Sequence, residues 1–190
     1  MRYEIRLAGS GGQGIVLAGI ILAEAGVIEG HQVVNSQNYG PEARGGTSIS
    51  EVIFSDTEID YPKALGLDIL LALNQMACDK NLHDVNEEGM VIVDSDLVKK
   101  VFWSKVVRAP FLHKAQARFN DPKFANMVAL GTLVPFCPWV STRSLSKAIR
   151  KRMSPEMARL NLAAFQTGLR AARRLQKNLK FREIEESTEV

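Results

Sequence analysis

Residues 9–14 read Gly-Ser-Gly-Gly-Gln-Gly and stand between a strand-like run, 2–8, and an almost wholly apolar run, 15–28. Glycines in such a loop permit a tight turn, and they let backbone N–H groups and the positive end of the following helix approach an anion. The spacing of Gly9, Gly11 and Gly14 also fits the dinucleotide-binding fingerprint. The loop alone leaves two interpretations open: a phosphate-type ligand, or close packing of the helix on the strand.

The second half of that fingerprint is missing. A dinucleotide site usually has an acidic residue at the end of the second strand, about 20 residues further on, which binds the ribose. The second strand is expected at 31–34, and it is followed by Asn-Ser-Gln-Asn at 35–38, without a carboxylate or an arginine. NAD or NADP binding is therefore disfavoured, although Asn35 could still donate a hydrogen bond. We expect a Rossmann-like unit that has not kept the Rossmann cofactor.

Strand-like and helix-like segments alternate along the chain, which predicts an α/β fold. Strands are expected at 2–8, 31–34, 47–54, 67–73, 90–93 and around 105–108, and helices at 15–28, 74–82 and 124–133. Ser141 and Ser154 are suitable N-caps for C-terminal helices. We predict a Rossmann-like, mostly parallel sheet flanked by helices, with C-terminal helices. It forms a single domain, 1–182, followed by an acidic, disordered tail, 183–190.

Ligands and partners of such sheets bind beyond the carboxyl ends of the strands. Those ends are expected at Gly9-Ser10, Asn35-Ser36, Asn74-Gln75 and Asp94-Ser95, which are all small or polar. A functional edge of the sheet is therefore predicted independently of the fingerprint.

The composition argues against a metal or membrane protein. The chain has 190 residues, of which 46% are hydrophobic and 24% charged, as in an ordinary globular domain. No run is long and apolar enough to cross a bilayer, and no signal-peptide pattern is present, so we expect no membrane partner and a cytoplasmic location. Two cysteines, Cys78 and Cys137, and three scattered histidines predict neither a metal site nor an iron–sulfur cluster. Each cysteine is expected to behave as a small apolar residue.

The net charge of +3 conceals an asymmetry. Residues 143–182 contain twelve Lys or Arg and one acidic residue, and four glutamates follow within 183–189. This pattern indicates a solvated helix face, or else a basic surface for nucleic acid or an acidic partner subunit. We expect no nucleic acid, because few aromatic residues stand among the basic ones and no nucleic-acid-binding motif is present.

Residues 39–46, Tyr-Gly-Pro-Glu-Ala-Arg-Gly-Gly, form a second loop of interest. It sets Glu42 and Arg44 among glycines that allow close approach to another molecule. An ion pair between these two side chains would contribute little at a surface, whereas glycines cost conformational entropy. We therefore favour a ligand contact or an interface over a simple surface turn.

The two loops together resemble the gamma subunits of the 2-oxoacid:ferredoxin oxidoreductases. The resemblance includes residues 68–77, with Leu-Asn-Gln at 73–75, the Val-Asp-Ser at 93–95 and the segment 126–131, and it extends over roughly residues 2–175. The second loop has the form of the 2-oxoglutarate branch and lacks the Arg-Arg-Gly-Ala version typical of pyruvate-type chains.

The resemblance implies a non-catalytic chain within a larger enzyme. Thiamine-binding alpha and beta subunits and a ferredoxin-like delta subunit would accompany it, and these partners would hold thiamine diphosphate, magnesium and the iron–sulfur clusters. The complex would decarboxylate a 2-oxoacid oxidatively, transfer the acyl group to coenzyme A and reduce ferredoxin. The sequence agrees, since it has no Gly-Asp-Gly…Asn-Asn thiamine signature. The family's gamma domain lies near coenzyme A, so the first loop would meet a phosphate or a neighbouring subunit.

The candidate ligand-binding residues come from the two loops and one strand end. They are Gly9, Ser10, Gly11, Gly12, Gln13, Gly14, Glu42, Arg44, Gly45, Gly46 and Asn74. None is expected to be catalytic or to bind a metal, and a contact with coenzyme A is the cofactor role they suggest. Two alternatives remain: a gamma subunit for pyruvate, branched-chain or indolyl 2-oxoacids, and a free-standing dinucleotide-dependent reductase.

Arg44 is the candidate residue for which we expect the largest effect of substitution. Its planar guanidinium suits a coenzyme A phosphate or a substrate carboxylate. In an assembled complex, Arg44→Ala should weaken use of coenzyme A or the 2-oxoacid by about 1.5–3 kcal/mol, on the order of ten- to a hundredfold in KM. Arg44→Lys should recover only part of this, because a point charge cannot make a bidentate contact. Loss of assembly would indicate an intersubunit contact instead, and normal turnover of both variants would contradict the assignment.

Overall fold

The computed structural model describes residues 1–39 and 46–178, and its elements are those of an α/β domain. The strands are β1 (Arg2–Ser10), β2 (Gln32–Tyr39), β3 (Thr47–Ser55), β4 (Leu67–Ala72), β5 (Val85–Asp94) and β6 (Val106–Ala109). The helices are α1 (Ile15–Glu29), α2 (Gln75–Asn81), α3 (Phe111–Phe119), α4 (Ala125–Leu133), α5 (Thr142–Arg152) and α6 (Pro155–Asn178). The expected fold class is confirmed, while the expected domain boundary at 182 and the tail lie outside the described residues.

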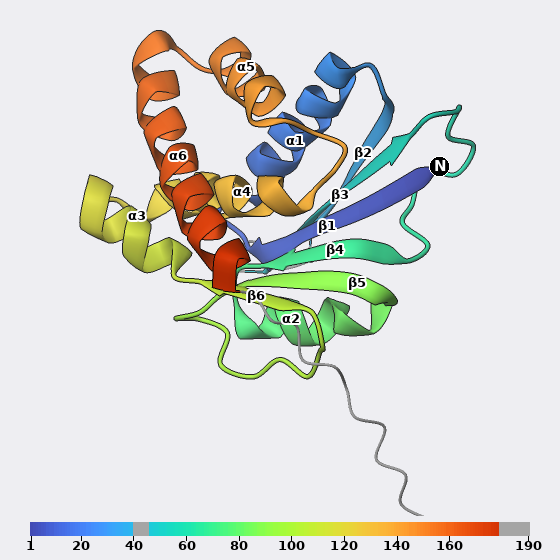
Figure 1. The fold of residues 1–190 in the computed structure, drawn as a ribbon, viewed down its shortest axis with the longest axis horizontal. Coiled ribbons are helices and arrows are strands. Elements are labelled where there is room, and N and C mark those ends of the chain that lie inside the picture. The colour runs from blue at the N-terminus through green and yellow to red at the C-terminus, as the bar shows by residue number, and fades with distance from the viewer. Residues whose placement is uncertain (40–45, 179–190) are drawn as a thin grey trace, which may run out of the picture.

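A single sheet runs through the molecule in the order β2-β3-β1-β4-β5-β6 (Figure 1). Strands β1, β4, β5 and β6 pair in parallel, and β3 is antiparallel to both β1 and β2. Only β3 therefore opposes the other five strands, which confirms the mostly parallel sheet. The sequence did not predict the place of β3. Because β3 separates β2 from β1, the end of β2 does not lie beside the loop after β1, as the dinucleotide fingerprint would require.

The expected carboxyl end at Asn35-Ser36 was wrong, because both residues lie inside β2. The Asn35 amide donates to the hydroxyl of Ser50 at 2.9 Å and to the carbonyl of Glu51 at 2.8 Å. The hydroxyl of Ser36 donates to the Glu51 carboxylate at 3.3 Å. These polar residues suit a strand interior because β3 supplies their partners across the pair.

Helices cover the sheet on both faces and bury two apolar clusters (Figure 1). On one face, Ile5 and Leu7 of β1 pack with Ile21 of α1, and α4, α5 and α6 complete the layer. On the other face, α2 places Cys78 in a cluster with Leu70 and other strand residues. Helix α1 contacts both the sheet and α5, which explains why its sequence is apolar nearly all round.

Both cysteines are free and buried, which confirms their expected apolar behaviour. Burial raises the pKa of Cys78 to about 11 and that of Cys137 to about 12. Both thiols are therefore protonated near neutral pH, and reactivity of a thiol requires the thiolate. Within 1–39 and 46–178, no three His, Cys, Asp or Glu residues are grouped as metal ligands, and no helix has the length and apolar character needed to span a bilayer.

The backbones of helices α4 and α6 pack directly against each other at two glycines. A Cβ added at Gly168 of α6 would lie 1.9 Å from the carbonyl oxygen of Val128, and one added at Gly131 of α4 would lie 2.0 Å from that of Phe165. The hydroxyl of Thr132 donates to the same Val128 carbonyl at 3.0 Å. A side chain at either glycine position would force the two helices apart.

Gly168→Ala should therefore destabilise the chain by about 1–3 kcal/mol through overpacking. The loss is expected even though alanine favours a helix over glycine by about 1 kcal/mol. Urea unfolding of the purified variant and wild type measures the difference. Arg159→Ala, an exposed change in the same helix, should stay within about 0.5 kcal/mol of wild type. Wild-type stability of Gly168→Ala would contradict the observed helix contact.

Candidate functional site

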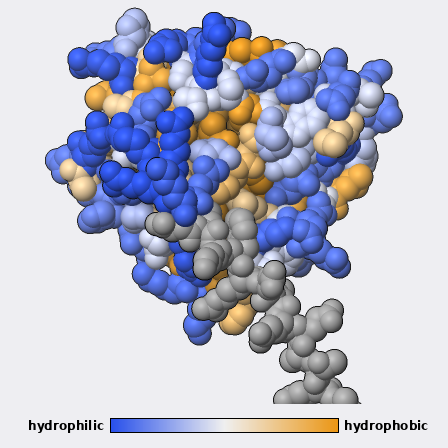
Figure 2. Space-filling view, viewed as in Figure 1, coloured by the Kyte–Doolittle hydropathy of each residue, from blue (hydrophilic) through white to orange (hydrophobic). Residues whose placement is uncertain are grey.

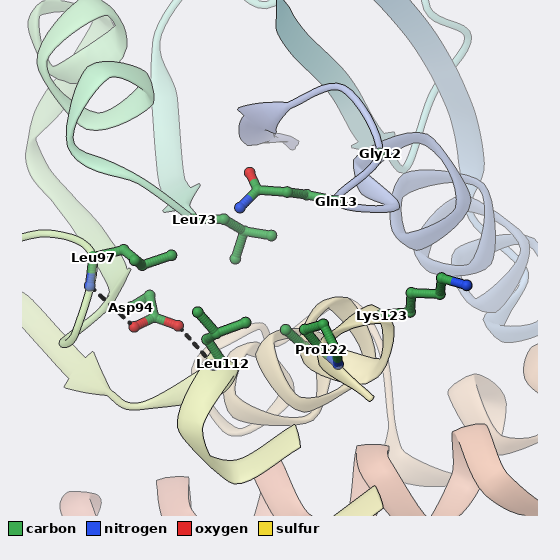
Figure 3. Close-up of a pocket in the computed structure, with 9 residues that line it drawn as sticks. Gly12, Gln13, Leu73, Asp94, Leu97, Leu112, Pro122 and Lys123 are labelled. Carbon is green, nitrogen blue, oxygen red and sulfur yellow. Dashed lines mark hydrogen bonds between the residues drawn. The ribbon is translucent and has the colours of Figure 1, made fainter. Parts of the chain in front are cut away.

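Strands β1, β4, β5 and β6 all end at one edge of the sheet, and three helices begin there. Strands β1, β4 and β5 end at Ser10, Ala72 and Asp94, and α1, α2 and α3 start shortly beyond the ends of β1, β4 and β6 (Figures 1 and 3). Residues 9–14, which we call the glycine loop, lie at this edge. Helix N-termini carry partial positive charge, so the edge is suited to polar or anionic groups.

Much of the hydrogen bonding of the glycine loop is internal. The side-chain oxygen of Gln13 accepts from the N–H of Ser10 at 2.7 Å, and the N–H of Gln13 donates to the carbonyl of Ser10 at 3.1 Å. The N–H of Gly11 donates to the carbonyl of Gly46 at 2.8 Å, which ties the glycine loop to the start of β3. The loop thus holds its own shape and leaves fewer backbone donors for a ligand than its sequence suggests.

Gly14 is required both by its conformation and by the space around it. Its φ of 72° lies in the left-handed region, and an added Cβ would lie 2.3 Å from the amide nitrogen of Asn126. That nitrogen donates to the carbonyl of Gly14 at 3.1 Å. Asn126 lies in the first turn of α4 and is not among the predicted site residues. Its only sequence signal is its place in the 126–131 segment of the resemblance.

Asn74 joins the glycine loop to α2. Its amide nitrogen donates to the hydroxyl of Ser10 at 3.0 Å and to the side-chain oxygen of Gln13 at 3.2 Å. Its amide oxygen accepts from the N–H of Ala77 at 2.9 Å and so caps α2. The structure therefore places Asn74 against the glycine loop, with both ends of its amide used in holding the edge together.

A pocket of about 200 Å³ opens beside the glycine loop (Figure 3). Its walls come from the glycine loop, the ends of β4 and β5, the start of α3 and the turn before α4, through Gly12, Gln13, Leu73, Asp94, Leu97, Leu112, Pro122, Lys123 and Ala125. Pockets for drug-sized ligands begin at about 300 Å³, so this pocket suits a small group or one end of a longer ligand.

Asp94 is the acidic residue of this pocket, and its carboxylate accepts hydrogen bonds from backbone N–H groups. One oxygen accepts from the N–H groups of Asp96 at 2.8 Å and Leu97 at 3.3 Å, and the other accepts from that of Leu112 at 2.8 Å. With 1% of its surface exposed, Asp94 holds the turn after β5 and the first turn of α3. The sequence indicated it as a polar strand end and as part of the 93–95 segment of the resemblance.

The second loop is described only in part. The carbonyl of Gly46 meets the glycine loop, whereas Glu42, Arg44 and Gly45 lie outside the described residues, so their ligand role stays a prediction. In the described part of the edge, the N–H of Gly12 takes part in no hydrogen bond. The N-cap of α1 is Gly14, which has no side chain to accept from the N–H groups of the first turn. These donors and the adjoining pocket suit binding of an anionic group.

Comparison with known proteins identifies the class. Residues 4–171 match the family model of pyruvate ferredoxin/flavodoxin oxidoreductases, so the chain belongs to this family. The resemblance drawn from the two loops is thereby confirmed. The chain is 44% identical to the 2-oxoglutarate synthase subunit KorC of Methanocaldococcus jannaschii, over 92% of this chain and 96% of that protein.

Solved structures agree with this assignment. The keto/oxoacid ferredoxin oxidoreductase gamma subunit of Geobacter sulfurreducens is similar with a TM-score of 0.80 at 43% identity, covering 90% of this chain and 99% of that one. The 2-oxoglutarate:ferredoxin oxidoreductase of Magnetococcus marinus has the same fold, with a TM-score of 0.81 at 24% identity over 96% of this chain and 32% of that one. The chain is therefore a gamma-type subunit of an oxidoreductase.

The contact between Gly14 and Asn126 can be tested by a double-mutant cycle. Gly14→Ala should destabilise the chain by about 1–3 kcal/mol, because alanine is strained at this φ and its Cβ meets the Asn126 amide. Asn126→Ala in the same chain should recover the part due to the clash and leave the part due to φ. Chemical unfolding of both single variants and the double variant measures the coupling. Strictly additive effects would contradict the contact.

Proposed function

We propose that this chain is the gamma subunit of a 2-oxoglutarate:ferredoxin oxidoreductase. The enzyme decarboxylates 2-oxoglutarate oxidatively, forms succinyl-CoA and reduces ferredoxin. Within it, this chain supports assembly and the coenzyme A side of the active site, and it is not itself catalytic. The likeness to the KorC subunit, at 44% identity over 96% of that protein, carries the choice of 2-oxoglutarate.

The edge around the glycine loop supports a role beside coenzyme A. A Cβ added at Gly12 would meet nothing within 4 Å, so the backbone there faces open space next to the pocket. A phosphate of coenzyme A in this space would be near the N–H of Gly12 and the N-terminus of α1, and Lys123 adds a positive charge to the pocket lining. The pocket itself has room for only a fragment of the coenzyme.

The companion subunits supply the remaining chemistry. Alpha and beta subunits hold thiamine diphosphate and magnesium, a ferredoxin-like delta subunit completes the cytoplasmic complex, and the iron–sulfur clusters lie within these partners. The buried thiols of this chain support that division, because burial raises the pKa values of Cys78 and Cys137 and disfavours the thiolates that bind iron. The position of β3 between β1 and β2 counts against the free-standing dinucleotide-dependent reductase.

The test is turnover of the complex assembled from this chain and its companion subunits. With coenzyme A and a viologen dye, 2-oxoglutarate should support turnover at least about tenfold faster than pyruvate, 2-oxoisovalerate or indolepyruvate, since a site built for its second carboxylate discriminates against substrates without one. The isolated chain should be colourless and inactive. Fastest turnover with another 2-oxoacid would move the chain to that branch, and a brown, active preparation of this chain alone would overturn the subunit assignment.

A further inference from the structure

A second concave surface lies between α3 and α6, near the end of β6. We call it the basic groove and define it by Arg108, Lys114, Arg118, Arg170 and Arg174, which line a cavity of about 330 Å³. Lys114 and Arg118 are one turn apart on α3, and Arg170 and Arg174 are one turn apart on α6, so the two helices each present a pair of cations. Figure 2 shows a strongly hydrophilic surface over these helices.

These cations have no carboxylate partner within the described residues. Other basic side chains do: Arg6 contacts Glu51, and Arg152 contacts Glu24. In the basic groove, Arg108 donates to the carbonyl of Val98 at 2.9 Å and Arg170 to the hydroxyl of Thr167 at 3.4 Å, and no ion pair is formed there by residues 1–39 and 46–178. Five like charges in one concavity raise the local potential and attract an anion.

The construction of the basic groove favours an acidic protein segment over a small anion. A small anion site normally uses fixed donors, yet the hydroxyl of Thr167, which lines the groove, already donates to the carbonyl of Ala163. The remaining donors are long side chains, each of which contributes little to a single exposed ion pair. Several carboxylates along one segment would engage the two helices together and so add their contributions.

The lining also contains apolar surface from Pro110, Ala171 and Leu175. Protein interfaces combine such apolar contact with arginine, which is enriched in them relative to the rest of the surface. We infer that the basic groove is a docking surface for an acidic segment of a companion subunit. This inference rests on the proposed function, because it takes the companion subunits of that oxidoreductase as the partners.

Charge reversal tests the inference in the full chain. Arg170→Glu/Arg174→Glu should weaken binding of the companion subunits by about tenfold or more, measured by titration with the labelled chain at roughly 0.1 M salt. The matched control, Arg143→Glu/Arg159→Glu, makes the same charge change at exposed positions outside the basic groove and should bind within about twofold of wild type. Equal binding by wild type and the groove variant would overturn the inference.

A second experiment identifies what occupies the basic groove. The milder Arg170→Lys/Arg174→Lys variant keeps the charges and introduces amines that a carbodiimide can join to nearby carboxylates. Cross-links from these lysines to Asp or Glu of a companion subunit are the expected result. Cross-links to the glutamates at 183–189 of this chain, cross-links to no protein, or protection of the lysines by inorganic phosphate at matched ionic strength would each overturn it.

The outcomes separate this inference from the proposed function. If wild type assembles and turns over 2-oxoglutarate, but the groove variant assembles equally well, only the docking surface fails. If wild type binds no companion subunit, both fail. If the complex assembles through the basic groove but prefers another 2-oxoacid, the docking surface stands and the substrate assignment falls.

Discussion

The chain turns from β1 into α1 inside the sheet, where β1 lies between β3 and β4, and the positions of three helices follow from this turn. Strand β1 pairs with both β3 and β4, and α1 packs on the same sheet, so the four residues between them must reverse the chain in close quarters. Gly14 makes this possible at a φ of 72°, and its carbonyl is held by Asn126. Because Asn74 also reaches the loop, helices α1, α2 and α4 are fixed relative to one another at this point.

The sequence predicted the alternating elements well, because apolar runs and glycine punctuation are local signals. It failed where a partner lies far along the chain. Asn35 resembled a strand end, yet β3 satisfies its amide and keeps it inside β2. Helix α3 went unpredicted because its first turn is held by Asp94, 18 residues earlier, while its own N-cap residue, Pro110, makes no side-chain hydrogen bond. The direction of β3 likewise follows from pairing, which no local pattern records.

For the candidate site too, the sequence predicted the local motif and missed the contacts between distant residues. The pattern of glycines located the turn, and the structure brings Ser10, Gln13 and Asn74 into contact as part of one edge. The sequence could not show that the side-chain oxygen of Gln13 would accept from the N–H of Ser10, which is then not open to a ligand. Nor could it show Asn126, which meets Gly14 across 112 residues of chain. The motif therefore predicted where the edge lies, whereas its free donors depend on tertiary contacts.

Those tertiary contacts connect the edge to the crossing of α4 and α6. Asn126 lies in the first turn of α4, and α4 is placed by its close crossing with α6, where Gly131 and Gly168 each meet a carbonyl of the other helix. A displacement of α6 would therefore move α4, and with it the amide that holds the carbonyl of Gly14. Packed helices transmit such shifts because protein interiors are close-packed and have little free volume. Gly131 and Gly168 at the helix crossing and Gly14 at the turn therefore act together. They set the position of α1 and of the backbone N–H groups at its N-terminus.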